Sequence, residues 1–122
     1  MQLKSENPSV EWSNITGDQC LRFEFGEQLT ELDAVNAIAE WKEAFESKPG
    51  QKVCLIWDCR KMRGYETGAR TQWTAALKEM KPQIGKVWLI SESTFIRMGG
   101  AVMAMFTSLE IKPVSSESEI LG

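Results

Sequence analysis

The chain contains no histidine among its 122 residues. This absence excludes histidine metal ligands, Ser-His-Asp triads and imidazole acid–base catalysis. A glycine-rich phosphate loop, a metal-ligating cluster and a nucleophile beside a positioned base are not recognisable either. We therefore expect a protein that is not an enzyme and that has no metal and no cofactor. A small enzyme of unknown reaction is the third alternative, with Asp58, Cys59 and Glu66 as neighbouring reactive groups.

Cysteine is scarce, because the chain has only Cys20, Cys54 and Cys59, and no two of them form a Cys-x-x-Cys pair. Cys54 lies in an apolar run and is expected to be a small buried side chain. Cys59 follows a strand beside Arg60 and Lys61, whose charges favour a lowered thiol pKa. The alternative is an ordinary free thiol.

Basic residues are not in excess, since 14 Lys and Arg stand against 17 Asp and Glu, for a formal net charge of −3. This balance disfavours nucleic acid as a partner. No apolar run is long enough to span a bilayer, and the first residues, MQLKSENPS, lack the core of a signal peptide. A cytoplasmic location is expected. The length predicts a single domain over 1–122, with flexible ends at 1–9 and 115–122.

Strand and helix patterns alternate along the chain. Hydrophobic periodicity and turn signals predict, in order, strands over 10–16 and 20–25 joined by a turn at 16–19, a helix from a capping box at 30–33 to about 47, a strand over 53–58, a helix over about 69–81, a strand over 86–91, a helix over 95–108 and an edge strand over 109–114. The first helix is expected to bury Leu32, Val35, Ile38, Trp41 and Phe45. The second is expected to bury Trp73, Ala76, Leu77 and Met80.

The runs VCLIWD and KVWLI are apolar on both faces, as in central strands that are covered on each side. Short connections make the later strands parallel neighbours through right-handed crossovers. The predicted fold is therefore a single α/β domain of order ββαβαβαβ, with a mixed sheet of about five strands flanked by helices.

This order resembles the STAS fold, and more narrowly the stand-alone bacterial SpoIIAA-like, anti-sigma-factor antagonist-like proteins. The resemblance covers nearly the whole chain and rests on FEFGEQLTELDAVNAIAEW, on KVCLIWDCRKMRGYETGA, and on KVWLISEST followed by a Met-rich helix. It implies a non-enzymatic regulatory module that acts by binding. The antagonists carry a phosphorylatable Ser between an Asp and a Gly, where this chain has Glu66-Thr67-Gly68, so the resemblance implies Thr67 as the phosphosite although both key residues differ. The alternative is that Thr67 caps the second helix.

Charged and hydroxyl groups follow two strands whose ends are expected to meet at one edge of the sheet. The first loop carries Asp58, Arg60, Arg63, Tyr65, Thr67 and Arg70, and the second carries Ser91, Ser93, Thr94 and Arg97. Guanidinium groups beside a helix amino terminus indicate an anion site, and the crevice between the loops is the expected place for a ligand. The alternatives are that Asp58 is a structural acceptor for loop N–H groups or Arg60, that the first loop is simply solvated, and that the hydroxyls cap the third helix.

The third helix is apolar almost all round. Its apolar side chains include Phe95, Met98, Val102, Met103, Met105 and Phe106. Either this helix is buried against the sheet, or it presents an apolar face to a lipid, a membrane surface or a partner.

Two versions of the binding function remain open. In one, a regulatory protein meets the surface around Arg63, Tyr65 and Thr67. In the other, the third helix moves and opens a pocket for an apolar anionic molecule, whose acidic group is held by Arg60 or Arg63. Peripheral membrane contact and a homodimer are further alternatives.

Overall fold

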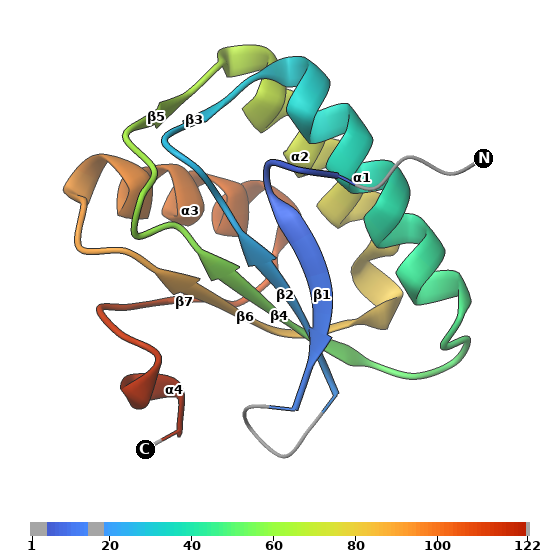
Figure 1. Ribbon diagram of the computed structural model, residues 1–122. Helices are drawn as coiled ribbons and strands as arrows, with labels where there is room; N and C mark the ends of the chain where they lie inside the picture. The colour runs from blue at the N-terminus through green and yellow to red at the C-terminus, as the bar shows by residue number, and fades with distance from the viewer. Residues whose placement is uncertain (1–4, 15–18, 122) are drawn as a thin grey trace.

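The computed structural model describes residues 5–14 and 19–121 (Figure 1). Its elements are β1 (Ser9–Ser13), β2 (Cys20–Glu24), β3 (Gln28–Leu29), α1 (Glu31–Glu46), β4 (Val53–Asp58), β5 (Gly64–Tyr65), α2 (Thr67–Met80), a 3₁₀ turn (Lys81–Gln83), β6 (Ile84–Ile90), α3 (Thr94–Thr107), β7 (Ile111–Val114) and α4 (Ser118–Leu121). The order ββαβαβαβ is present, and β3, β5 and α4 are additions that periodicity did not indicate. The predicted turn at 16–19 lies mostly outside the described residues.

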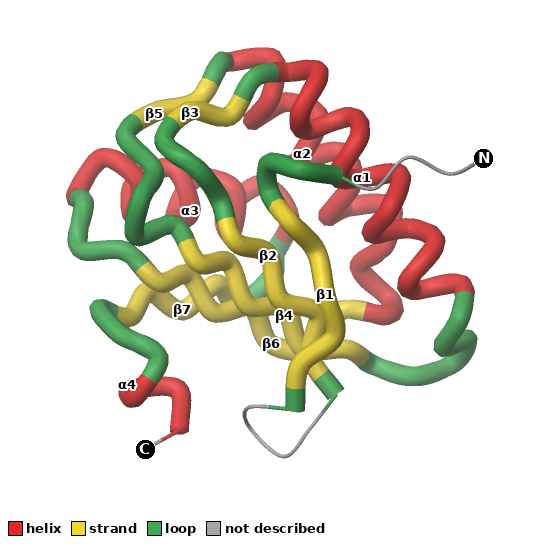
Figure 2. Tube along the Cα trace, viewed as in Figure 1, coloured by secondary structure: helices red, strands yellow, loops and turns green. Residues whose placement is uncertain are grey.

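Five strands form one mixed sheet in the order β1-β2-β4-β6-β7. β1 pairs antiparallel with β2, and all other neighbours are parallel. The predicted hairpin pairing and the edge position of the Pro-containing strand are both confirmed. Because each crossover steps to the next strand in the same direction, right-handed connections place α1, α2 and α3 on one face of the sheet. Figures 1 and 2 show these three helices behind the sheet and the short α4 on its other side.

The main core lies between the sheet and the three long helices. Phe23 of β2, Trp41 of α1 and Trp73 of α2 meet there, with ring centroids 5.3 to 5.6 Å apart. The predicted stripe of α2 is buried in this cluster as expected. Large aromatic rings thus fill the space between the helices and β2 and β4.

The opposite face of the sheet has a smaller apolar cluster, formed by Cys20, Ile56, Ile90, Val114 and, from α4, Ile120. Trp88 packs against this cluster, and the ammonium nitrogens of Lys86 and Lys112 lie 4.7 and 5.3 Å from the centre of its ring. Cation–π contacts and a four-residue helix therefore shield strands that are apolar on both faces. The two faces are covered unequally, whereas the sequence predicts cover on each side.

The buried stripe of α1 differs from the prediction. Leu32 and Val35 are exposed, at 69% and 44% of their surface, so their expected burial is wrong. Ala34 and Ala37 are fully buried instead. The first turns of α1 lie so close to the rest of the core that alanine takes the inner positions and the larger side chains point outward.

The starts of α1 and α2 are fastened to each other. β3 and β5 form a separate two-stranded parallel pair, in which Leu29 is opposite Tyr65. The predicted capping box of Thr30 and Asp33 begins α1, and the Glu66 carboxylate accepts a hydrogen bond of 2.7 Å from the backbone N–H of Glu31. These contacts fix the backbone on either side of Tyr65.

Candidate functional site: a pocket between α2 and α3

The loops after β4 and β6 lie side by side at one edge of the sheet. Asp58 is paired with Ile90, and the backbone N–H of Cys59 donates to the carbonyl of Ile90 at 3.0 Å. The next strand continues the edge, because Ser91 N–H donates to the Val114 carbonyl at 2.9 Å. The predicted common edge is confirmed.

At this edge, Asp58 lies within an ion network on the face that carries α4. Its carboxylate accepts hydrogen bonds from Arg22 at 2.5 Å and from the Arg60 side chain at 2.9 and 2.6 Å. Glu117, just before α4, binds the same two arginines at 2.6 and 3.0 Å. Asp58 is buried, so these contacts compensate a charge that would be costly alone. The structural interpretation of Asp58 is confirmed.

The network shifts the pKa values of its members. Burial favours the neutral form of Asp58, but hydrogen bonds and charge from Arg60, with Arg22, outweigh it and lower the pKa of this carboxyl. Burial also opposes the charge of Arg22, but Glu117 and Asp58 outweigh it and raise its pKa. Hydrogen bonding to Asp58 raises the pKa of Arg60. All three groups therefore keep their charges at neutral pH.

Two predictions for the first loop are wrong. Arg60 is bound to Asp58 and Glu117 on the α4 face of the sheet, so it is not available to hold a ligand in a pocket on the helix face. Burial, and then the charge of Asp58, raise the pKa of Cys59, so its thiol stays protonated and is not activated. The chain turns at the end of β4, and this turn separates Arg60 from the basic residues that follow it.

The second loop has structural contacts throughout. Ser93 caps α3 by accepting the Ile96 N–H, and the buried Ser91 hydroxyl accepts the Ser93 N–H at 3.0 Å. Arg97 donates to the Ser91 carbonyl at 2.6 Å and to the Ser115 hydroxyl at 3.1 Å. Thr94 is the exposed first residue of α3. The predicted hydroxyl capping of α3 is confirmed, with Ser93 as the capping residue.

Arg63, just before β5, and Thr67, in the first turn of α2, are both exposed. The Arg63 side chain is 84% exposed and lies 3.6 Å from Glu27. Thr67 is the first residue of α2, and Glu66 is the N-cap, so the prediction that Thr67 caps this helix is wrong. Phosphorylation of Thr67 stays a prediction.

On the helix face, the edge of the sheet opens into a pocket between α2 and α3. The pocket is lined by Phe25, Leu29, Trp57, Cys59, Met62, Tyr65, Ala69, Arg70, Trp73, Leu89, Ile96, Gly99, Gly100 and Met103. The space between these side chains is about 450 Å³ with the open mouth included, but only about 50 Å³ admits the centre of a water-sized sphere. The pocket is therefore narrow and almost entirely apolar.

Arg70 is the one charged residue in this lining. It is half-buried, and its guanidinium makes no hydrogen bond or ion pair with any residue in 5–14 or 19–121. Trp57, also in the lining, has a buried indole N–H without a hydrogen-bond partner in the same part of the chain. The surface that these residues present to the pocket is apolar, so Arg70 contributes the aliphatic part of its side chain to the wall.

Tyr65 lines the pocket and packs against α3. Its ring stacks on Phe95 with centroids 5.3 Å apart, and its hydroxyl group lies against Gly99. A Cβ atom on Gly99 would lie 3.2 Å from Tyr65 Cζ and closer still to the hydroxyl, so only glycine leaves room for this ring. The sequence signal for this contact was the Gly99-Gly100 pair inside a helix, although its partner could not be deduced.

α3 is buried on one face and exposed on the other, so both interpretations of this helix hold in part. Ile96, Gly99 and Gly100 pack inward. Phe95, Met98, Met105 and Phe106 are 55 to 77% exposed. Of the two remaining members of the predicted face, Val102 and Met103 are half-buried, and Met103 lines the pocket.

Sequence reasoning did not identify Arg22 and Glu117 as members of the ion network. It also did not identify the aromatic side chains Phe25, Trp57 and Trp73 as part of a pocket wall. Arg22 is one charge in an alternating strand, and its binding to Glu117 joins residues 95 positions apart in the sequence. Neither carries a local signal. Within the described residues, no group of three Cys, Asp or Glu side chains is placed to bind a metal, and no helix has the length and apolarity to span a bilayer.

Comparison with solved structures identifies the architecture. The chain is similar to an uncharacterized protein of the DUF3478 family from Shewanella loihica PV-4, described as having a SpoIIAA-like fold, with a TM-score of 0.77 over 95% of this chain and 94% of that one. The chain has a SpoIIAA-like fold. Sequence identity is 15%, so the similarity is one of fold. No family model matches the sequence. No curated protein matches it either.

Proposed function

We propose that this SpoIIAA-like domain is a binding module that takes an apolar anionic small molecule into the pocket between α2 and α3. Arg70 would hold the acidic group, and the apolar walls would bury the remainder. The observation that carries the proposal is the half-buried side chain of Arg70, which lines an apolar pocket and whose guanidinium has no polar partner in residues 5–14 or 19–121.

The two faces of the sheet make this observation informative. Arg22 and Arg60 both bind the carboxylates of Asp58 and Glu117 on the α4 face. Arg70 has no such partner among the described residues, although it is partly withdrawn from water. A guanidinium in such a place binds a carboxylate strongly, because charge-assisted hydrogen bonds strengthen where water is excluded.

The test is calorimetric titration with a panel of alkyl and aryl carboxylates and their neutral alcohol analogues. We expect at least one acid to bind, its alcohol to bind more weakly, and Arg70→Gln to reduce its affinity about tenfold or more. Arg63→Gln is the matched control, because Arg63 is exposed, has a carboxylate beside it and lies outside the pocket lining. Absence of binding across the panel, or equal losses in the two variants, would refute the proposal.

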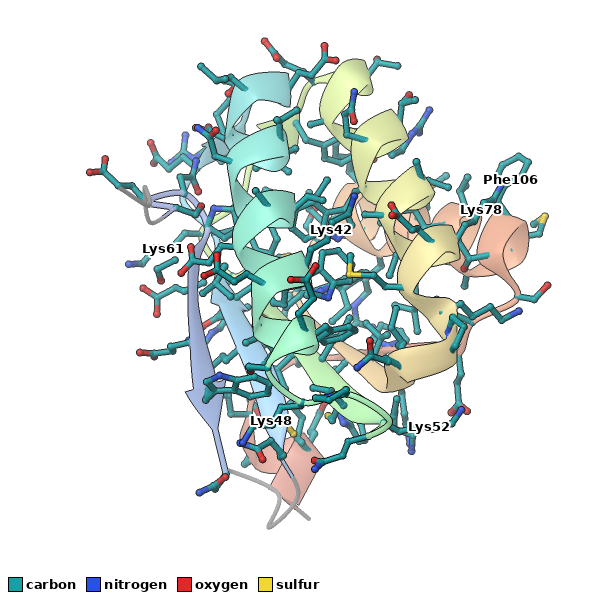
Figure 3. The ribbon with its side chains drawn as sticks, turned by 90° about the vertical axis from the view of Figure 1, so that its right-hand side faces the viewer. Lys42, Lys48, Lys52, Lys61, Lys78 and Phe106 are labelled. Atoms are coloured by element: carbon teal, nitrogen blue, oxygen red, sulfur yellow. The ribbon has the colours of Figure 1, made fainter. Side chains whose placement is uncertain are left out.

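A second candidate function is contact with a membrane surface through α3. Phe95, Met98, Met105 and Phe106 form an exposed apolar stripe on this helix. In the view of Figure 3, Lys78 of α2 and Phe106 of α3 lie on the same side of the molecule. Apolar side chains bordered by lysine are suited to the interface of an anionic bilayer.

Sedimentation with phosphatidylglycerol vesicles tests this second candidate. A Met105→Ser and Phe106→Ser double variant should lose most of its vesicle-bound fraction. Leu32→Ser serves as the control, because Leu32 is equally exposed but lies on α1. Equal loss in both variants would point to general stickiness and would argue against a membrane-binding stripe on α3.

A further inference from the structure

We infer that the ligand of this pocket is a compact, flat aromatic carboxylate that takes the place of the Tyr65 ring over Gly99, with its carboxylate on Arg70. This inference rests on the proposed function and narrows it to one class of acid. Three features carry it: the shape of the slot over Gly99, the weak hold on Tyr65, and the rigid inner end of the pocket.

The slot over Gly99 already holds an aromatic ring. Tyr65 stacks on Phe95 at 5.3 Å with an angle of 23° between the planes, and the hydroxyl end of its ring lies against Gly99. The missing Cβ of Gly99 leaves a space that a flat ring fills. Gly100 continues the stripe inward, and its own Cβ would lie 2.7 Å from Leu89, so the helix here is pressed onto the sheet. A flat ring can make the same stack on Phe95 as Tyr65 does, whereas a branched group cannot.

Packing contacts alone hold the Tyr65 side chain in place. Its ring is half-buried, and its hydroxyl donates to and accepts from no residue within the described chain. The ring can turn out of the slot about its side-chain torsions, while its backbone stays paired in β5. The contacts that Tyr65 loses on Phe95 and Gly99 are ones that another aromatic ring can make in its place.

The inner end of the pocket limits the length of the ligand. Trp57 and Trp73 close it, with ring centroids 6.1 Å apart, and Phe25 packs on Trp73 at 5.6 Å. All three rings belong to the main core. Only about 50 Å³ of the pocket admits the centre of a water-sized sphere, and this space together with the place of the Tyr65 ring suits one aromatic ring and its carboxylate. A long alkyl chain would need the core itself to move.

Titration of benzoate, benzyl alcohol and decanoate into the folded protein tests the inference. We expect benzoate to bind, benzyl alcohol to bind about tenfold more weakly or worse, and decanoate to bind more weakly than benzoate. Tyr65→Ala should raise benzoate affinity several-fold, because the competing ring is gone. Gly99→Ala should lower it at least tenfold, because the methyl group fills the slot.

The possible outcomes separate this inference from the proposed function. Binding of decanoate without benzoate overturns the aromatic class and leaves the anion pocket intact. Lack of binding by either acid overturns both. If Gly99→Ala does not fold by circular dichroism, Tyr65→Ala decides alone: unchanged or weaker benzoate binding overturns the inference. Tyr65→Phe is the control for the hydroxyl and should bind benzoate as the natural protein does.

Discussion

The arginines on the two faces of the sheet differ in whether they have carboxylate partners. On the α4 face, Arg22 and Arg60 share the carboxylates of Asp58 and Glu117 at 2.5 to 3.0 Å. On the helix face, Arg70 borders an apolar pocket without such a partner in the described chain. Paired charges on the α4 face hold the loop after β4 and the segment before α4 to the sheet, whereas Arg70 on the helix face has no carboxylate partner among the described residues. Local sequence makes these arginines look alike, and only their partners tell them apart.

The largest loss of stability should come from removing a carboxylate of the ion network on the α4 face. Asp58→Asn removes the buried carboxylate that Arg22 and Arg60 share, and we expect a loss of about 3 kcal/mol in the free energy of unfolding. Urea denaturation measures it. Glu79→Gln is the control, because the Lys42–Glu79 pair is exposed on both sides and should contribute below about 1 kcal/mol. Equal effects of the two changes would mean that the Asp58 network contributes no more than a surface pair.

The carboxyl group of Asp58 should also make the stability of the protein depend on pH. The pKa of Asp58 is lowered in the folded protein from its ordinary value of 3.8, so its contribution is complete above that value and is lost as pH falls through the folded pKa. The difference in stability between the natural protein and Asp58→Asn should therefore shrink below about pH 4. Denaturation midpoints of both proteins across pH 2 to 7 (about seven conditions) would show it. A difference that stays constant with pH would contradict the role of the ionised form.

Substitution of the two glycines of α3 by alanine should change stability unequally, because Gly100 faces the main core and Gly99 faces the pocket. Gly100→Ala forces a methyl group against Leu89 in the main core, and we expect a loss of about 1 to 3 kcal/mol. Gly99→Ala meets only the end of the movable Tyr65 side chain, while alanine favours the helix by about 1 kcal/mol. Its stability should stay within about 1 kcal/mol of the natural protein. Thermal melts of both variants measure this, and a larger loss for Gly99→Ala would show that Tyr65 is firmly held.

The smallest change in stability should come from Arg70→Gln. Removing a side chain without polar partners should alter the free energy of unfolding by no more than about 0.5 kcal/mol. Chemical denaturation without ligand measures this quantity. A substantial loss would show that Arg70 has a structural role, and the distinction between the two faces would disappear.

Much of the fold follows from local patterns. The apolar alternation of Leu21, Phe23 and Phe25 and the periodic stripe of α2 appear in the core as predicted, because a buried face imposes its own period. The capping box at Thr30 and the cap at Ser93 depend on neighbours three residues away, so the sequence predicts them as well.

The remainder depends on distant partners. Leu32 and Val35 fit a helical stripe as well as Ala34 and Ala37 do, and only the closeness of the neighbouring elements decides which pair is inside. The polar segment from Ser115 onward predicts a flexible tail, yet Glu117 there binds two arginines and Ile120 covers the second apolar cluster. Arg60, Arg63 and Arg70 are near one another in the sequence, but the turn after β4 sends the first to the opposite face.

The hydrogen bonds of Arg97 hold the amino-terminal end of α3, which borders the pocket. They fasten the first turn of α3 to the end of β6 and to Ser115, whereas the last turn ends at Ser108 in a left-handed conformation with φ of 58° and carries the exposed Met105 and Phe106. We therefore expect any displacement of this helix to be smaller at Arg97 than at Phe106. Backbone amides near Phe106 should exchange with deuterium sooner than those near Arg97, and an occupied pocket should slow both.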